Sequence, residues 1–452
     1  MPGRNRRGRD AMGVGLAFLN RLAGVGAIDK LKLRKPIERA VYEGSRVGFR
    51  GVGVANRRFA AAGKRGKAQR PSTATGRDLF DLTPTDEQKM MVDATREFAA
   101  EQLRPVAAAA DDACETSNEV LKRSVAELGV TLVAVPEALG GMGAERSATT
   151  GVLVAEALAH GDMGQAVACL APAGVSNALV LWGDEHQQAT YLPSFVGDDV
   201  PAAAVAVLEA RPLFDPFRLQ TKATRRDGGF VLDGAKSLVP RAATAELFVV
   251  AADLEGAPAL FIVESGTKGV LIEGEPAMGL RAASTARLVL DAVSLPGSAL
   301  LGGVSETPSS RGLPSADAYA DCIRLARIGW AALACGTGRA VLDYVIPYVN
   351  DRVAFGEPIS HRQAVAFTVA DIAIELEGAR LVTLRAAARA EQGLPYAREA
   401  GLARRLTAEY GMQIGSSGVQ LLGGHGFVKE HPVERWYRDL RAVGVMEGVV
   451  LV

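Results

Sequence analysis

The apolar residues of this chain follow a helical spacing over its first structured region. The spacing runs from Thr85 to Pro105, and Thr85 or Asp86 is placed to cap the first turn. Similar helical patterns recur over about residues 116–129, 146–160, 164–182 and 186–195. The pattern therefore predicts an N-terminal helical region.

The spacing then changes twice along the chain. Between about residues 202 and 298, short apolar runs are bounded by Gly, Asp and Pro, which is typical of strands. These runs are GGFVLDGA, LFVVAADL, ALFIVES, GVLIEGE and ARLVLDAVSLP. Beyond them, Ala- and Leu-rich helical patterns cover about residues 315–350, 361–391 and 396–422. They predict a compact antiparallel β-domain followed by a helical bundle.

The fold class that follows is α+β, with four parts along the chain. We expect a basic arm at 1–79, an N-terminal helical domain at 80–200, a middle β-domain at 201–300 and a C-terminal bundle at 301–452. A chain of 452 residues is long enough for this organisation. No stretch reaches the roughly 18–20 apolar residues that span a bilayer, and no secretory signal follows MPGRNRRGRD.

The formal net charge of zero conceals an uneven distribution. Residues 1–70 hold 18 of the 51 Lys and Arg but 4 of the 51 Asp and Glu, so the remainder carries 33 basic against 47 acidic residues. Within the arm, 12–28 has the spacing of an amphipathic helix, although four glycines weaken it. We expect contact with a membrane surface through residues 1–70 and no nucleic acid. A solvated arm, an arm packed on its own acidic body, a partner-binding segment and a transit peptide remain alternatives.

Cysteine and histidine usage favours a protein without a metal site. The four Cys form no C-x-x-C pair, so neither a disulfide framework nor a zinc site is indicated, and a cytoplasmic location is expected, with membrane association as the alternative. His425, Glu430 and His431 do not have the spacing of a helical metal pair. No Rossmann fingerprint follows a strand.

One carboxylate, Glu447, lies inside the apolar run RDLRAVGVMEGVVLV. A carboxylate among apolar side chains is in general a usable base near neutral pH. The alternative is a Glu that points outward from a surface helix or strand end. Position alone leaves both interpretations open.

Five motifs occur in an order and spacing that resemble the acyl-CoA dehydrogenase family. They are AELGVTLVAVPEALGGMG (126–143), MGLRAASTARLVLDAVSLP (278–296), DRVAFGEPISHRQ (351–363), QLLGGHGFVKEHPVERWYRDLR (420–441) and MEG (446–448). The resemblance covers roughly residues 80–450, and the K-E before V-E-R is most similar to the very-long-chain branch. One such motif is weakly specific; five in order are specific.

The resemblance implies FAD bound between subunits and α,β-dehydrogenation of an acyl-CoA in fatty acid or steroid side-chain β-oxidation. Glu447 occupies the position of the family's base, and Gly448 that of a substrate contact. A homodimer or homotetramer, with an electron-transfer flavoprotein as electron acceptor, is also implied. The positions that match the family's cofactor contacts are Arg352, Phe355, Gln363, Gln420, Gly423 and Gly424.

Two of these matches have plain structural alternatives. Arg352 could form a surface salt bridge with Asp351 or Glu357. The Gly423–Gly424 pair could be a turn that ends a helix.

The chain departs from the family where a subunit contacts its own flavin. The family's T-E-P-x-x-G-S-D aligns with LEARPLFD, so Leu208, Ala210 and Phe214 replace Thr, Pro and Ser. The family's W-I-T-N becomes SLVP, in which Val239 has no hydroxyl and Pro240 no backbone N–H.

The same departures continue at the end of the sequence. Val449 replaces the Thr of E-G-T, and the sequence stops at Val452 where the family continues. A second hypothesis is therefore a catalytically silent subunit that lends flavin contacts to a partner, in a heterotetramer with another acyl-CoA dehydrogenase subunit. A third is a dehydrogenase-like scaffold that docks on a membrane through its basic arm.

Overall fold

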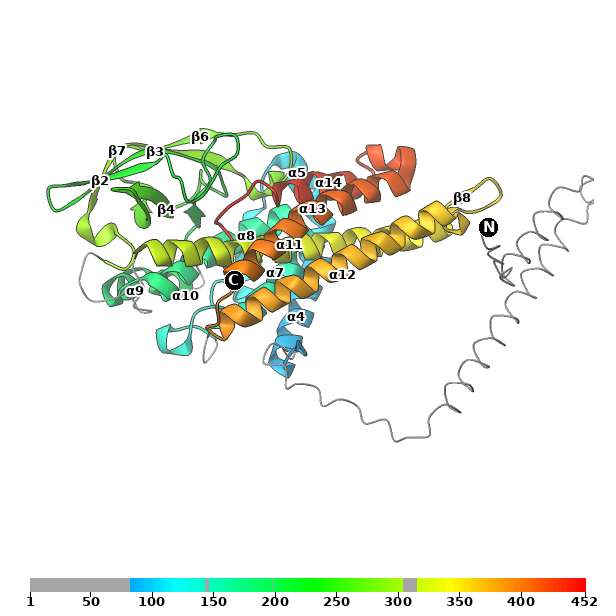
Figure 1. Cartoon of the computed structure of the whole chain (residues 1–452), viewed down its shortest axis with the longest axis horizontal. Helices are drawn as coiled ribbons and strands as arrows, with labels where there is room; N and C mark the ends of the chain where they lie inside the picture. The colour runs from blue at the N-terminus through cyan, green and yellow to red at the C-terminus, as the bar shows by residue number, and fades with distance from the viewer. Residues whose placement is uncertain (1–81, 143–145, 198, 304–314) are drawn as a thin grey trace, which may run out of the picture. The chain divides into compact units, whose positions relative to one another are not determined.

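The computed structural model describes residues 82–142, 146–197, 199–303 and 315–452. By its contacts the chain divides into two units, Met1–Leu79 and Phe80–Val452. The predicted basic arm lies outside the described residues. The second unit, coloured in Figure 1, contains all of the elements that follow.

The N-terminal region is helical, as the sequence predicts. Its elements are α4 (Asp86–Phe98), η1 (Ala99–Leu103), η2 (Arg104–Val106), α5 (Ala107–Ala113), α6 (Asn118–Leu128), η3 (Glu137–Leu139), α7 (Ala148–Gly161), α8 (Met163–Trp182), α9 (Glu185–Tyr191) and α10 (Pro193–Val196). Thr85 caps α4: its hydroxyl accepts from the Gln88 N–H at 3.2 Å, and the Gln88 side chain accepts from the Thr85 N–H at 3.0 Å. The regular helix ends at Phe98, because the chain passes into a π-turn and then into a 3₁₀ turn that contains Pro105.

Helix α8 corrects the expectation about apolar stretches. By length and composition alone its 20 residues could span a membrane, but 94% of its apolar window is buried inside the protein. It is the central helix of the N-terminal region and packs against β1 and α7.

The middle region is a seven-stranded sheet that holds a hydrophobic core of its own. Its strands are β1 (Ala203–Ala206), β2 (Lys222–Arg226), β3 (Gly229–Val239), β4 (Leu247–Leu254), β5 (Ala257–Glu264), β6 (Val270–Gly274) and β7 (Ala286–Pro296). The strand order is β1-β4-β2-β3-β7-β6, with β5 on β4. The β-domain is confirmed, although β4 pairs in parallel with both β1 and β2, whereas the sequence predicted antiparallel pairing. The long connection from β1 to β4 makes parallel pairing possible.

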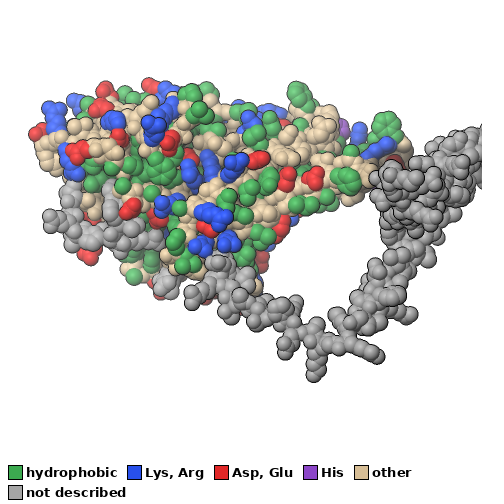
Figure 2. Space-filling view, viewed as in Figure 1, with side chains coloured by type: hydrophobic (Ala, Val, Ile, Leu, Met, Phe, Trp, Pro, Cys, Tyr) green, Lys and Arg blue, Asp and Glu red, His purple; other side chains and the backbone are tan. Residues whose placement is uncertain are grey.

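The C-terminal region is the expected bundle. Its elements are α11 (Ser315–Asp351), β8 (Val353–Ala354), β9 (Glu357–Pro358), η6 (Ile359–His361), α12 (Gln363–Glu391), α13 (Ala397–Leu422), η7 (Gly423–Phe427) and α14 (Val433–Ala442). Helices α11, α12 and α13 lie side by side, and α7 packs on α11 (Figure 1). Figure 2 shows acidic, basic and apolar side chains interspersed over the visible face, so the acidic excess beyond the arm forms no single patch there.

The β-domain and the helices meet at the last residues of the chain. Gly448 forms an isolated antiparallel bridge with Ala206 at the end of β1. Every residue from Met446 to Val452 is buried. This junction places the predicted base, Glu447, between the two layers.

Candidate active site

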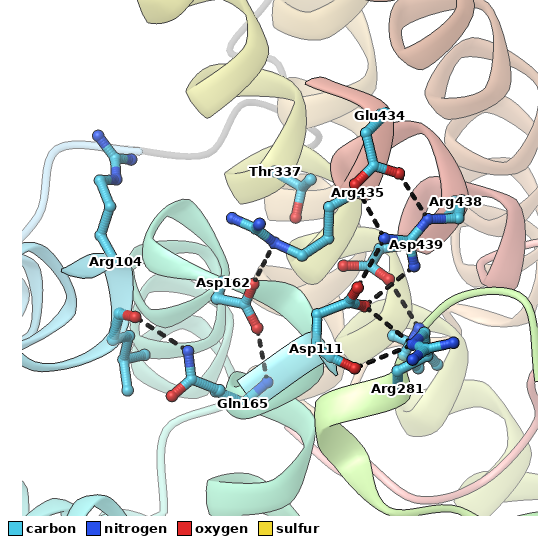
Figure 3. A network of polar contacts seen from close by, with 12 residues as sticks. Arg104, Asp111, Asp162, Gln165, Arg281, Thr337, Glu434, Arg435, Arg438 and Asp439 are labelled. Carbon is cyan, nitrogen blue, oxygen red and sulfur yellow. Dashed lines mark hydrogen bonds and ion pairs between the residues drawn. The ribbon is translucent and has the colours of Figure 1, made fainter. Parts of the chain in front are cut away.

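Helix α14, which precedes Glu447, is fixed by a buried polar network (Figure 3). Arg435 Nε lies 3.0 Å from Asp162 Oδ2 at the start of α8. Arg438 Nη2 lies 2.8 Å from Asp111 Oδ2 in α5. The Leu280 N–H donates to Asp439 Oδ1 at 2.6 Å, which joins α14 to the β-domain. The network therefore sets the position from which the chain continues to Glu447.

Two carboxylates of this network are held in an environment that disfavours their charge. Burial raises the pKa of Asp162. Burial, with the charge of Asp162 nearby, raises the pKa of Asp439 to about 7. The network thus retains a proton at pH values where an exposed Asp is ionised.

Glu447 is buried, with 6% of its surface exposed, and is ion-paired with two arginines. Arg327 of α11 approaches its carboxylate with Nη2 at 2.9 Å and Nε at 3.2 and 3.3 Å from the two oxygens. Arg404 Nη2 of α13 lies 3.7 Å from Glu447 Oε1 and donates to the Met446 carbonyl at 2.7 Å. Trp330 Nε1 donates to the Gly448 carbonyl at 2.9 Å.

This geometry decides between the two interpretations of Glu447. The outward-facing surface Glu is wrong, because the side chain is buried among apolar neighbours. The carboxylate is nevertheless not isolated, since it is ion-paired with the guanidinium groups of Arg327 and Arg404. It can accept a proton, and its orientation depends on α11 and α13.

A cavity of about 440 Å³ lies beside Met446, between the β-domain and helices α13 and α14. Its walls are mostly apolar, with two guanidinium groups; they are Leu238, Ala277, Met278, Gly279, Leu280, Thr285, Met412, Arg438, Arg441, Ala442, Gly444, Val445 and Met446. Apolar walls with a few polar groups suit a planar aromatic ring system. The cavity reaches Met446, the residue before Glu447, whereas the Glu447 carboxylate itself is held by Arg327 and Arg404.

The segment SLVP contributes only Leu238 to the wall of this cavity. The Leu238 N–H donates to Glu275 at 2.6 Å and the Ser237 hydroxyl donates to the same carboxylate at 2.7 Å. Val239 is buried in β3. These two donors are therefore engaged within the β-domain, and Val239 has no hydroxyl to donate.

In the segment LEARPLFD, Glu209 has a structural role. Lys236 Nζ lies 2.9 Å from Glu209 Oε1, and both side chains are buried. Glu209 also accepts from the N–H groups of Gln220 and Thr221 at 2.8 and 2.9 Å. Burial lowers the pKa of Lys236 to about 8. This pair ties β3 to the loop after β1 and leaves Glu209 committed within the fold.

The other predicted cofactor residues gather at a different end of the bundle. Tyr348, one turn before the end of α11, places its hydroxyl 2.9 Å from His425 Nδ1 and donates to the Leu422 carbonyl at 3.4 Å, so α11 ends beside the glycine pair. The predicted residues at this end are Arg352 and Phe355 beyond α11, Gln363 at the start of α12, and Gln420, Gly423 and Gly424 at the end of α13.

These residues are available for contact. Phe355 is 94% exposed, and the Arg362 guanidinium lies 5.2 Å from its ring centre. Within the described part of the chain, the Arg352 guanidinium has no hydrogen-bond or ion-pair partner, so the salt bridge to Asp351 or Glu357 is not formed. Gly423 does end α13, with φ of +58°, and both glycines face open space. A free cation, an exposed ring and open backbone suit a diphosphate-containing ligand.

The two groups of predicted residues are far apart within one chain. Arg327, which contacts Glu447, and Tyr348, which contacts the glycine end, lie on the same helix α11, 21 residues apart. At 1.5 Å per residue, the separation is about 32 Å. Within one chain, the residues around Glu447 and the Arg352 end of the bundle therefore form two separate groups.

The two histidines considered as metal ligands in the sequence, His425 and His431, instead form contacts within the fold. His425 and His431 stack with ring centres 5.3 Å apart, and the Nδ1 atom of each is hydrogen-bonded to a tyrosine hydroxyl. No three His, Cys, Asp or Glu side chains converge on a possible metal position in residues 82–142, 146–197, 199–303 or 315–452.

Three residues that contact the Glu447 segment, Arg327, Arg404 and Trp330, were not predicted from the sequence. A signal for Arg327 was its place as a lone cation in the apolar run LARIGWAA.

Comparison with known proteins identifies the family of this chain. Residues 85–199, 204–293 and 317–450 match the N-terminal, middle and C-terminal domains of acyl-CoA dehydrogenases. The chain is 33% identical over 374 residues to the mitochondrial short/branched chain specific acyl-CoA dehydrogenase of Rattus norvegicus, covering 81% of this chain and 83% of that protein. It is 29% identical to an acyl-CoA dehydrogenase of Bacillus subtilis, covering 80% and 95%. The butyryl-CoA dehydrogenase structure from Megasphaera elsdenii superposes with a TM-score of 0.73 at 28% identity, covering 82% and 96%.

Proposed function

This chain belongs to the acyl-CoA dehydrogenase family of FAD-dependent oxidoreductases that act on CH–CH bonds of acyl-CoA thioesters, and on that premise we propose that it dehydrogenates a short acyl-CoA in fatty acid β-oxidation with Glu447 as base. The relatives named for short and branched chains, and for butyryl-CoA, favour a short acyl group over a steroid side chain. The K-E-H-P-V-E-R segment, which is most similar to the very-long-chain branch, is weaker evidence for a longer acyl group.

The chemistry requires a base on one side of the acyl group. Glu447 accepts the proton from the carbon next to the thioester carbonyl, and its burial keeps water away from the carbanion that forms. Bound FAD supplies the acceptor for the hydride that leaves the β-carbon. Arg327 holds the carboxylate in one orientation, because its Nη2 and Nε donate to Oε1 and its Nε also donates to Oε2.

The observation that carries this proposal is the position of Glu447 one residue from the apolar cavity between the β-domain and α14. The test is anaerobic addition of butyryl-CoA to the purified flavoprotein. We expect the visible flavin absorbance to bleach in the wild type and in the surface control Glu97→Gln, and to persist in Glu447→Gln. Bleaching at the same rate in Glu447→Gln would sink the assignment of the base.

Two partners complete the proposal. An electron-transfer flavoprotein reoxidises the flavin, as is typical of the family. A second subunit supplies the Arg352–Gly424 end to each flavin, because that end lies about 32 Å from Glu447 within one chain. We propose a dimer or a dimer of dimers as the smallest active assembly.

A second candidate is a subunit that only lends these contacts to a different partner chain. It is favoured by the pairing of Glu447 with two arginines, by the engagement of Ser237 and Leu238 with Glu275, and by the Arg352 guanidinium, which has no partner among the described residues. Co-expression with a family relative that has intact T-E-P, W-I-T and E-G-T motifs separates the candidates. If this chain only lends contacts, Glu447→Gln leaves turnover of the complex intact and Arg352→Ala lowers it. Loss of turnover in Glu447→Gln excludes the lending role.

A further inference from the structure

Residues Gly448–Val452, the 448–452 segment, run through the interior between three helices. Each helix carries a glycine where the segment crosses it. A Cβ on Gly174 of α8 would lie 2.1 Å from the Val449 carbonyl oxygen, and a Cβ on Gly329 of α11 would lie 2.3 Å from the Val450 carbonyl oxygen. On α7, a Cβ at Gly151 would lie 3.1 Å from Val452 Cα. Only glycine allows this approach at the first two crossings.

The segment is anchored along its backbone. Trp330 Nε1 donates to the Gly448 carbonyl at 2.9 Å, and Asn177 Nδ2 donates to the Leu451 carbonyl at 2.8 Å. Val449 has φ of +72°, a conformation that a β-branched residue adopts only where its surroundings impose it. The four apolar side chains after Gly448 are at most 5% exposed. The path is therefore a specified part of the core.

This path starts at the base. An acyl group whose α-carbon meets the Glu447 carboxylate must place its remaining methylenes in apolar surroundings next to that residue. The space between α7, α8 and α11 next to Glu447 is apolar, but the side chains of Val449, Val450, Leu451 and Val452 already fill it. These branched side chains present the same chemistry as the methylenes of a long acyl chain.

We propose that the 448–452 segment limits the length of the acyl group, because it occupies the space that a long chain would enter. This inference rests on the proposed function and deepens it: the substrate is a short acyl-CoA. Each methylene that gains burial should tighten binding about fourfold, from the transfer free energy of one CH₂. A closed space removes that gain beyond the first few carbons.

The test uses the FAD-loaded protein and two thioether analogues, of butyryl-CoA and octanoyl-CoA, in which sulfur replaces the β-carbon so that neither can be dehydrogenated. Dissociation constants are measured by calorimetry. We expect the wild type to bind the two analogues within about fourfold of each other. The thinned double variant Val450→Ala/Leu451→Ala should bind the octanoyl analogue at least tenfold more tightly than the wild type does, with the butyryl analogue unchanged.

A second variant tests the same inference by displacing the 448–452 segment instead of shortening its side chains. Gly329→Ala should also raise octanoyl affinity, because its methyl group meets the Val450 carbonyl. Gly338→Ala on the same helix meets the end of the flexible Leu376 side chain at 3.1 Å and Ile414 at 3.6 Å and beyond, but not the 448–452 segment, and should behave as wild type. The inference is overturned if the wild type already prefers the octanoyl analogue a hundredfold, if neither the double variant nor Gly329→Ala changes the preference, or if no analogue binds any of these proteins. Failure of the proposed function is a separate result: analogues bind, but butyryl-CoA is not dehydrogenated.

Discussion

Arg327 Nη2 lies 2.9 Å from Glu447 Oε1, and both side chains are largely withdrawn from solvent. The contact joins the middle of the longest helix, α11, to the loop that follows α14. A base held in this way has one orientation, and its charge is balanced inside the protein. The predictions below follow from this pairing and from its surroundings.

Removal of Arg327 should destabilise the fold. Arg327→Ala leaves Glu447 buried with Arg404 as its charge partner at 3.7 Å, and breaking a buried pair in this way costs about 3–5 kcal/mol in the free energy of unfolding. Denaturant titration measures the loss. Arg405→Ala, at an exposed position of α13, is the control and should leave the free energy of unfolding unchanged. Equal stability of the two variants would contradict a buried ion pair.

Trp330 should contribute a hydrogen bond that other buried tryptophans do not. Trp330→Phe leaves the Gly448 carbonyl without its donor and should cost about 1 kcal/mol more than Trp182→Phe. Trp182 is equally buried, but its Nε1 has no protein partner among the described residues, so it controls for the lost indole volume. Thermal unfolding of both variants provides the comparison, and a larger loss for Trp182→Phe would refute the assignment.

The exposed end of the bundle should matter for cofactor binding and not for folding. Arg352→Ala removes a cation with no partner in the described chain, so it should lower FAD affinity about tenfold or more without lowering the melting temperature. Lys268→Ala, a surface cation between β5 and β6, should leave both quantities unchanged. Flavin content after gel filtration, measured beside the melting curve, checks both. Unchanged flavin content in Arg352→Ala would contradict the predicted contact.

Asp439 should make the protein less stable as pH rises. Its pKa is about 7 in the folded protein and about 3.9 when unfolded, so between these values the folded state binds more protons. Stability therefore falls as pH increases from about 4, and the penalty is complete above about 7. Asp439→Asn keeps an acceptor for the Leu280 N–H and removes the charge. We expect it to be about 4 kcal/mol more stable than wild type at pH 8 and equal to it at pH 4.

The control for that comparison is Asp93→Asn, an exposed position on α4, which should follow the wild-type pH profile. A difference between Asp439→Asn and wild type that is the same at pH 4 and pH 8 would show that the effect is packing and not charge.

Much of the fold could be predicted from the spacing of apolar residues. LFVVAADL and ARLVLDAVSLP coincide with β4 and β7, because β4 is mostly buried, β7 has buried apolar residues at alternating positions, and both are bounded by polar or Pro residues. KATRR of β2 was not predicted, since four of its five residues are exposed and give no apolar signal. Helix α14 was also missed, because its sequence, VERWYRDLRA, places charged side chains on a buried network.

The candidate site could be predicted only in part, for the same physical reason. Glu447 and the Arg352 motif stand out because their residue types are unusual in their local sequence. Their separation by about 32 Å follows from the length of α11 and has no local signal. The partners Arg327 and Arg404 come from segments far away in sequence, and spacing along a chain does not reveal tertiary contacts. The glycines at 174 and 329 acquire meaning only once the 448–452 segment is seen to cross them.

The most direct measurement of the central claim is deuterium incorporation at the α-carbon of an acyl-CoA. The FAD-loaded protein is incubated in D₂O with the butyryl thioether analogue, which cannot lose a hydride, and the analogue is examined by mass spectrometry. If Glu447 is the base, the wild type exchanges the α-hydrogens and Glu447→Gln exchanges them at least 100-fold more slowly. Equal exchange by the two proteins, or none by the wild type, would contradict the account.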